Sequence, residues 1–186
     1  SQGQTKEVSR IYMNTLYLAG LFSGLFFLVG VVGSKSLAVL LGADGSVFEM
    51  TNTYLKWLLL FAPAFIWNDV LLCFVRNDEG PKLAMGAMLI GSFGNILLDY
   101  VFVFPMKMGM FGAILATGCS PLISMGMMLP HWLRKRNSFK ICKTRMESAI
   151  VKQELALGFP SLVSQLSSAV VMITFNGLIL GLEGNT

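Results

Sequence analysis

Long apolar runs separated by short polar links make up most of this chain. Five of the runs approach 20 residues, the length that an α-helix needs to cross the hydrocarbon core of a bilayer. They are expected at about residues 11–33, 52–75, 83–104, 110–133 and 158–180. The pattern therefore predicts an all-α fold, a polytopic membrane helix bundle with five transmembrane helices.

Composition supports a membrane protein. Apolar residues make up 54% of the chain, charged residues only 13%, and the mean hydropathy is +0.67. A soluble domain has about 25% charged residues.

The short link 105–109 predicts that the third and fourth apolar runs form an antiparallel hairpin. The second half of the basic link, 143–157, is interpreted as an amphipathic helix on the membrane surface.

The distribution of Lys and Arg predicts an orientation, because cytoplasmic links carry an excess of these residues. With a cytoplasmic N-terminus, only Lys35 and Lys107 fall in links on the outer side. The inner links then hold Lys6, Arg10, Arg76, Lys82, Arg134, Lys135, Arg136, Lys140, Lys143, Arg145 and Lys152. We therefore expect a multi-pass protein of the bacterial inner (plasma) membrane with its N-terminus in the cytoplasm.

The third run contains the first candidate site. Asn95 and Asp99 are four residues apart, so a helix places them on nearly the same face. A carboxylate inside a bilayer costs about 2.5–3.5 kcal/mol on insertion scales, and such a residue is a functional candidate by default.

The predicted hairpin supplies partners for this pair. Its turn is centred near Met108, so Thr117 on the fourth run lies at a depth similar to that of Asp99, and the Ala113 carbonyl lies one turn away. Carboxylate, amide, hydroxyl and carbonyl oxygens suit a small cation, such as sodium at Asp99, or a proton relay. The alternative is a structural Asp99 that joins two helices by hydrogen bonds.

The sequence contains no motif for metal binding by cysteine or for enzyme catalysis. Cys73, Cys119 and Cys142 form no CxxC pair, and the chain has no GxSxG, P-loop, GxGxxG, HExxH or zinc spacing. We therefore expect no enzyme activity and no cofactor.

The basic link has no interleaved aromatic residues, so no nucleic acid is expected. His131 is interpreted as an interfacial anchor. Met125, Met127 and Met128 are either packing residues or a soft surface for apolar ligands.

Several motifs, taken in order, resemble those of the multidrug and toxic compound extrusion (MATE) family. They are Arg76-Asn-Asp-Glu-Gly-Pro81, Gly94-Asn-Ile-Leu-Leu-Asp99, Gly109-Met-Phe-Gly-Ala-Ile-Leu-Ala-Thr117 and Gly158-Phe-Pro-Ser161. The resemblance implies a twelve-helix transporter of two six-helix lobes. Its members exchange cationic or amphiphilic drugs for protons or sodium ions by alternating access.

The same resemblance implies that this chain is a fragment covering helices three to seven. Residues 1–133 would be part of the N-terminal lobe, with four helices. Residues 134–157 would be the basic cytoplasmic link between the lobes, and residues 158–186 the first helix of the C-terminal lobe. The partners implied are small-molecule drugs, membrane lipids and the remaining helices of the full-length transporter.

The family's ion site maps onto Asn95, Asp99, Ala113 and Thr117, and Asn68 matches an asparagine frequent in its fourth helix. The aspartate that the family carries on its first helix has no counterpart in this chain. Gln165 and Asn176 are weaker candidates for the substrate cleft. Some relatives have an ion-coupling acid in the seventh helix, whereas this chain has Ser164-Gln-Leu-Ser-Ser168 there. The coupling role therefore falls on Asp99.

Three alternatives stay open at this point. A flippase for lipid-linked oligosaccharides would need a cationic cleft. Lys56 is the only Lys or Arg within the five predicted spans, which counts against this alternative. A non-transporting membrane scaffold would not need a buried Asp99. An intramembrane enzyme would need a nucleophile–base pair, which the sequence does not offer.

Overall fold

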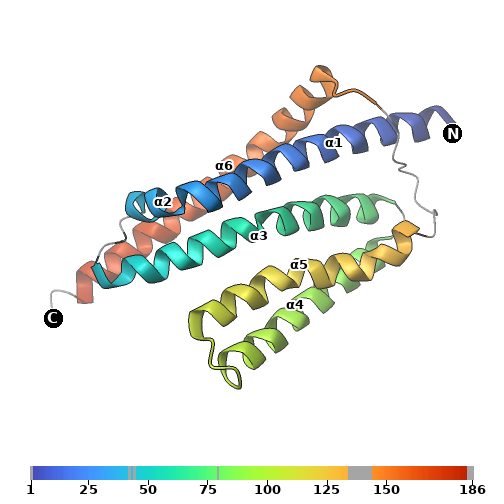
Figure 1. Cartoon of the computed structure of the whole chain (residues 1–186). Helices are drawn as coiled ribbons and strands as arrows, with labels where there is room; N and C mark the ends of the chain where they lie inside the picture. The colour runs from blue at the N-terminus through green and yellow to red at the C-terminus, as the bar shows by residue number, and fades with distance from the viewer. Residues whose placement is uncertain (1, 42, 44, 79, 134–143, 184–186) are drawn as a thin grey trace. The chain divides into compact units, whose positions relative to one another are not determined.

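A computed structural model describes residues 2–41, 43, 45–78, 80–133 and 144–183. The elements are α1 (Gln2–Leu28), the π-helix η1 (Val29–Gly33), α2 (Ser34–Leu40), α3 (Gly45–Asn77), α4 (Pro81–Val103), α5 (Gly109–Leu133) and α6 (Ser148–Glu183) (Figure 1). The described residues contain no strand, so the predicted all-α class is confirmed. The chain divides into two compact units, residues 1–144 and 145–186, and each is described by itself.

Five helical stretches in the described residues are long and apolar enough to cross a membrane. They are Lys6–Leu40, Val47–Asn77, Pro81–Val103, Gly109–His131 and Ser148–Met172. Large apolar side chains along them are exposed, such as Leu97 and Phe93 of α4. Exposed apolar surface of this extent indicates a lipid or protein environment. The protein is a multi-pass membrane protein, as the sequence predicts.

Three helices begin well before the apolar runs that predict them: α1, α6 and also α3, which starts at Gly45 rather than near residue 52. Residues 2–10, expected as a polar start before the first span, belong to α1. Gln, Lys, Glu and Arg are good helix formers, so this polar segment extends the helix. In the second unit, α6 begins at Ser148 and continues through Gly158 and Pro160. The expected surface helix and the expected fifth span are therefore parts of one helix, because a membrane helix tolerates an internal proline.

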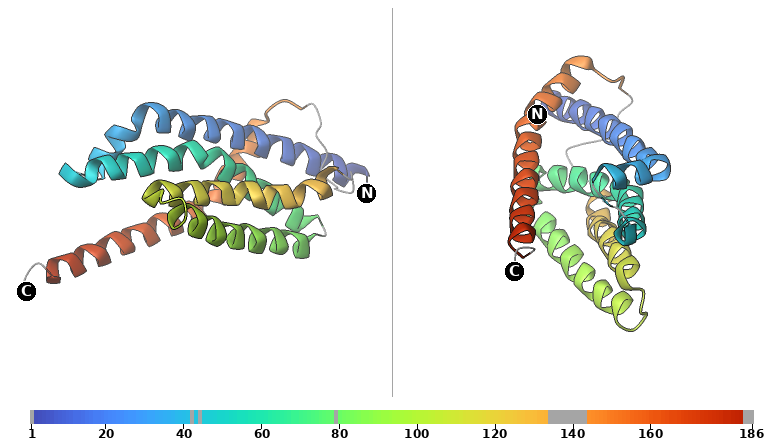
Figure 2. Two further views of the ribbon diagram at one scale, coloured as in Figure 1. Left: turned by 60° about the horizontal axis from the view of Figure 1, so that its bottom comes forward. Right: turned by 90° about the vertical axis from the view of Figure 1, so that its left-hand side faces the viewer.

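Helix α1 packs antiparallel against α3, as the two views of Figure 2 show. At one end, the rings of Tyr12 and Phe74 meet edge to face, with their centroids 4.6 Å apart. At the other end, a Cβ on Gly30 would lie 2.8 Å from the Cβ of Leu59. Only glycine permits this approach, so Gly30 fixes the distance between η1 and α3.

Helices α4 and α5 form the predicted antiparallel hairpin. Their turn closes with bonds from the Met106 N–H to the Val101 carbonyl and from the Met108 N–H to the Phe102 carbonyl. Gly109 has φ +55°, a conformation that favours glycine. A core shared with α3 joins the three helices, and it comprises Leu72, Val75, Ala84, Ala87 and Met128.

Candidate functional site

Three of the predicted site residues hold buried polar atoms that have no hydrogen-bond partner within the protein. These atoms are the Oδ1 of Asn68 on α3 and, on α4, the Nδ2 of Asn95 and the Oδ1 of Asp99. An unsatisfied buried polar atom costs about 1–3 kcal/mol, so each one calls for an explanation. A bound cation or water would satisfy the two oxygens, and water would satisfy the Asn95 nitrogen; unsatisfied atoms of this kind are expected in a binding site.

The packing of α4 on α5 decides which of the predicted residues are neighbours. The Ser120 hydroxyl donates to the Gly91 carbonyl at 2.9 Å. A Cβ on Gly112 would lie 2.9 Å from the Cβ of Phe102. Between these two contacts, the α5 segment with Ala113 and Thr117 runs alongside the α4 segment with Asn95 and Asp99. Ala113 and Thr117 are half-buried, and the hairpin register inferred from the sequence agrees with this packing.

Asn68 belongs to a polar cavity that the sequence interpretation did not include. The cavity has a volume of about 200 Å³ and lies among α3, α4 and α5. Its lining comprises Phe65, Asn68, Asp69, Leu72, Met88, Gly91, Ser92, Ser120, Pro121 and Ser124. Asn95, Asp99, Ala113 and Thr117 are not among these lining residues. The structure therefore places Asn68 in the lining of this cavity.

One signal in the sequence could have located this cavity. Ser120 and Ser124 are four residues apart, as Asn95 and Asp99 are, so a helix places them on one face. Ser124 is only 3% exposed and its Oγ has no partner within the protein. Asp69, the residue after Asn68, also lines the cavity and is exposed.

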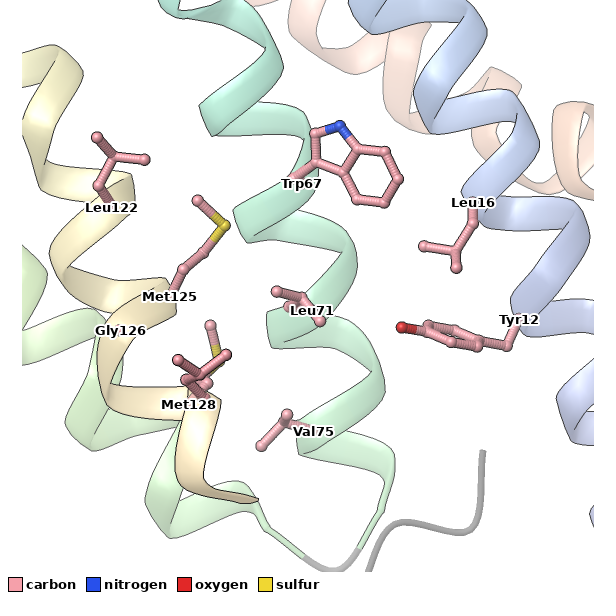
Figure 3. A pocket seen from close by; sticks show the side chains of 10 residues that line it. Tyr12, Leu16, Trp67, Leu71, Val75, Leu122, Met125, Gly126 and Met128 are labelled. Atoms are coloured by element: carbon pink, nitrogen blue, oxygen red, sulfur yellow. The ribbon is translucent and has the colours of Figure 1, made fainter. Parts of the chain in front are cut away.

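A second, apolar cavity of about 560 Å³ lies among α1, α3 and α5. It is lined by Tyr12, Leu16, Trp67, Leu71, Val75, Leu122, Met125, Gly126, Met128 and Leu129. Figure 3 shows Tyr12 and Leu16 of α1 on one side, Trp67 and Leu71 of α3 between, and Met125 of α5 on the other. Small-molecule sites are typically 300–1,000 Å³ and mostly apolar, so the cavity has the size and chemistry of such a site.

The remaining residues that the sequence singled out lie in different places. Met125 and Met128 line the apolar cavity, whereas Met127 packs near Gly86 of α4. Gln165 is exposed on α6. The side chain of Asn176 lies outside the described residues, and so does Cys142. Among the described residues, no group of three or more His, Cys, Asp or Glu side chains could hold a metal ion. A cation here would depend on amide, hydroxyl and single carboxylate oxygens.

His131 contacts the connection between α3 and α4. Its Nε2 lies 3.4 Å from the Oδ2 of Asp78, which follows α3 in the connection to α4. The Asp78 side chain is only 6% exposed. This contact ties the end of α5 to the α3–α4 connection.

Apolar helices of membrane length define a multi-pass membrane protein, and here they contain buried polar atoms without partners within the protein. The MatE family model matches residues 1–101, more than half of the chain. The chain belongs to the MatE family.

Individual relatives cover nearly all of this chain. The multidrug export protein MepA of Staphylococcus saprophyticus subsp. saprophyticus is 28% identical over 180 residues, which cover 96% of this chain and 39% of MepA. The chain thus spans about two fifths of that relative's length.

Two solved structures of multidrug resistance MATE family transporters of the MOP superfamily are also similar. One, in an outward-facing conformation, has a TM-score of 0.80 at 27% identity, over 89% of this chain and 37% of that one. The other, in an inward-facing conformation, has a TM-score of 0.75 at 26% identity, over 89% of this chain and 41% of that one.

Proposed function

We propose that the intact protein is a secondary active antiporter that exports cationic or amphiphilic drugs in exchange for protons or sodium ions. Family membership and the similarity to multidrug export proteins support this proposal. The observation that carries the coupling role is the pair of unsatisfied buried atoms on α4, the Nδ2 of Asn95 and the Oδ1 of Asp99. In a transporter that binds a cation there, the Asp99 oxygen gains a partner when the cation arrives.

Asp99 supplies the negative charge of this site. A carboxylate inside a membrane span is costly, and proteins retain such residues for ion pathways and proton relays. Asn95 lies one helical turn before it on α4, and Thr117 lies on the facing segment of α5. Rotation of the Asn95 amide presents its oxygen instead of its nitrogen. One carboxylate, one amide oxygen and one hydroxyl would then face the same ion.

The apolar cavity is our candidate for contact with the exported compound. Tyr12 and Trp67 provide aromatic surface, and Met125 and Met128 provide flexible, polarizable contacts. Aromatic faces attract cations. A lipophilic cation therefore matches both the apolar lining and the aromatic rings of the cavity. The Met residues then take the ligand-binding role that the sequence left open beside packing.

We also propose the membrane and the orientation of the protein. Lys6, Arg10, Arg76 and Lys82 lie at helix ends that share one side of the membrane if every span crosses it once. The positive-inside rule makes that side cytoplasmic. The N-terminal end of α1 is then cytoplasmic, in the bacterial inner membrane.

Transport by the intact protein in liposomes tests the function. A fluorescent lipophilic cation is loaded on one side, and a sodium gradient or a pH gradient is imposed separately. We expect one of the two gradients to drive drug movement, and Asp99→Asn to abolish that dependence. Glu49→Gln, an exposed acid on α3, is the matched control and should transport normally. Gradient-driven transport that is unchanged in Asp99→Asn would contradict the coupling role.

A further inference from the structure

Side-chain oxygens from three helices line the polar cavity among α3, α4 and α5. Asn68 and Asp69 are consecutive on α3, while Ser120 and Ser124 come from α5. Ser92 adds a hydroxyl from α4. Asp69 is the only charged side chain among the residues that line the cavity. The cavity therefore combines a single negative charge with neutral oxygens.

Two of these side chains hold buried oxygen atoms that have no hydrogen-bond partner. Ser124 is 3% exposed, and neither its Oγ nor the Oδ1 of Asn68 has a hydrogen-bond partner within the protein. The Ser120 hydroxyl donates a hydrogen bond to the Gly91 carbonyl. Its oxygen lone pairs therefore remain available to a ligand. Each of these groups can accept a hydrogen bond or coordinate a cation.

We propose that this cavity is a second site for a monovalent cation, sodium or hydronium, with Asp69 as its charged ligand. Ser124, Ser120 and Asn68 supply neutral oxygens. Hard oxygen ligands are the ones that small, hard cations prefer. A volume of about 200 Å³ holds such an ion together with several waters. Asp69 is exposed, which gives the ion access to its carboxylate.

The second site is separate from the Asp99 site but adjacent to it. Asn95 lies four residues beyond Gly91 on α4, and Asp99 lies four residues beyond Asn95. Each step is about 6 Å along a helix. The cavity therefore lies, along α4, on the side of Asp99 that is toward the His131 end of α5. The proposal rests on the proposed antiport, because it gives the coupling ion a second binding position.

Direct ion binding to the purified intact protein tests this site without any transport step. Radioactive sodium is titrated at fixed pH. Proton uptake is measured separately without sodium, between about pH 8 and pH 6, where an ordinary carboxylate stays ionised. We expect Asp69→Asn to bind about one ion per protein fewer in one of these two arms, which identifies the cation. Glu49→Gln should match the wild type. Equal stoichiometry of Asp69→Asn and wild type in both arms would overturn the second site.

A second variant keeps the test decisive if Asp69→Asn does not fold. Ser124→Ala should weaken binding at this site about five- to tenfold, as loss of one buried ligand implies. Ser23→Ala is its control, because Ser23 is also buried and its Oγ also unsatisfied, on α1 away from the cavity. Unchanged binding by Ser124→Ala would overturn the assignment.

The Asp99→Asn protein distinguishes the two proposals. It should retain the ion that Asp69 binds, and loss of all binding would mean that only a single site exists. If drug transport does not depend on Asp99 while binding still depends on Asp69, the antiport proposal fails and the second site stands.

Discussion

Gly118 of α5 lies directly against the aromatic ring of Phe61 of α3, so that a Cβ atom at position 118 would overlap the ring carbons. Nearby, the rings of Trp57 and Phe111 meet edge to face, with centroids 5.2 Å apart. The absence of a side chain at position 118 therefore sets how closely α3 approaches α5. This spacing bears on both cavities, because each is lined by residues of these two helices.

Gly118→Ala should destabilise the intact protein. The added methyl group forces the Phe61 ring to move, and overpacking of this kind costs about 1–3 kcal/mol. Gly126→Ala is the matched control on the same helix, since a Cβ there meets no atom within 4 Å. Thermal unfolding in detergent measures both. A Gly118→Ala protein as stable as the control would contradict the close packing.

Asn95→Ala should weaken binding of the coupling ion at the Asp99 site. Loss of one buried ligand costs about 1–1.5 kcal/mol, which is roughly tenfold in affinity. The ion concentration that gives half-maximal drug transport should rise accordingly, while the maximal rate persists. Asn52→Ala, which removes another buried unsatisfied Oδ1 on α3, should leave that concentration unchanged. Equal effects of both variants would point to a general loss of structure.

Gly126→Phe should block the apolar cavity. Gly126 lines the cavity and has open space around its Cα, so a ring there fills volume without displacing the backbone. We expect drug binding to fall about tenfold or more, since a filled pocket loses the apolar burial that small ligands depend on. Tryptophan fluorescence quenching by the drug, with Gly126→Ala as control, measures the change. Full drug affinity in Gly126→Phe would exclude the cavity as the drug site.

The Asp78–His131 contact should stabilise the end of α5. Asp78→Ala removes a largely buried acceptor, and we expect a loss of about 1–3 kcal/mol in unfolding free energy. A double-mutant cycle with His131→Ala isolates the pairwise part, expected at about 0.5–1.5 kcal/mol. Additive single effects would show that the two side chains do not stabilise one another.

Much of the fold follows from the sequence because it depends on local properties. The lengths of the apolar runs predict the membrane helices, and the short link 105–109 predicts the α4–α5 hairpin with its register. That register brings the segment of Asn95 and Asp99 alongside Thr117. The helix ends are less predictable. Residues 2–10 and 148–157 are polar enough to lie outside a membrane, yet helical propensity extends α1 and α6 through them.

By itself, the sequence determined the membrane class, the spans and the buried charge at Asp99. These depend on hydropathy and on spacing along one chain. Only the tertiary structure decided that Asp69, Ser120 and Ser124 line one cavity and that Tyr12, Trp67 and Met125 line another. Each cavity combines residues of three helices, and the close approach at Gly118 and Gly30 sets how those helices pack. A spacing rule within one helix holds no information about the distance to its neighbours.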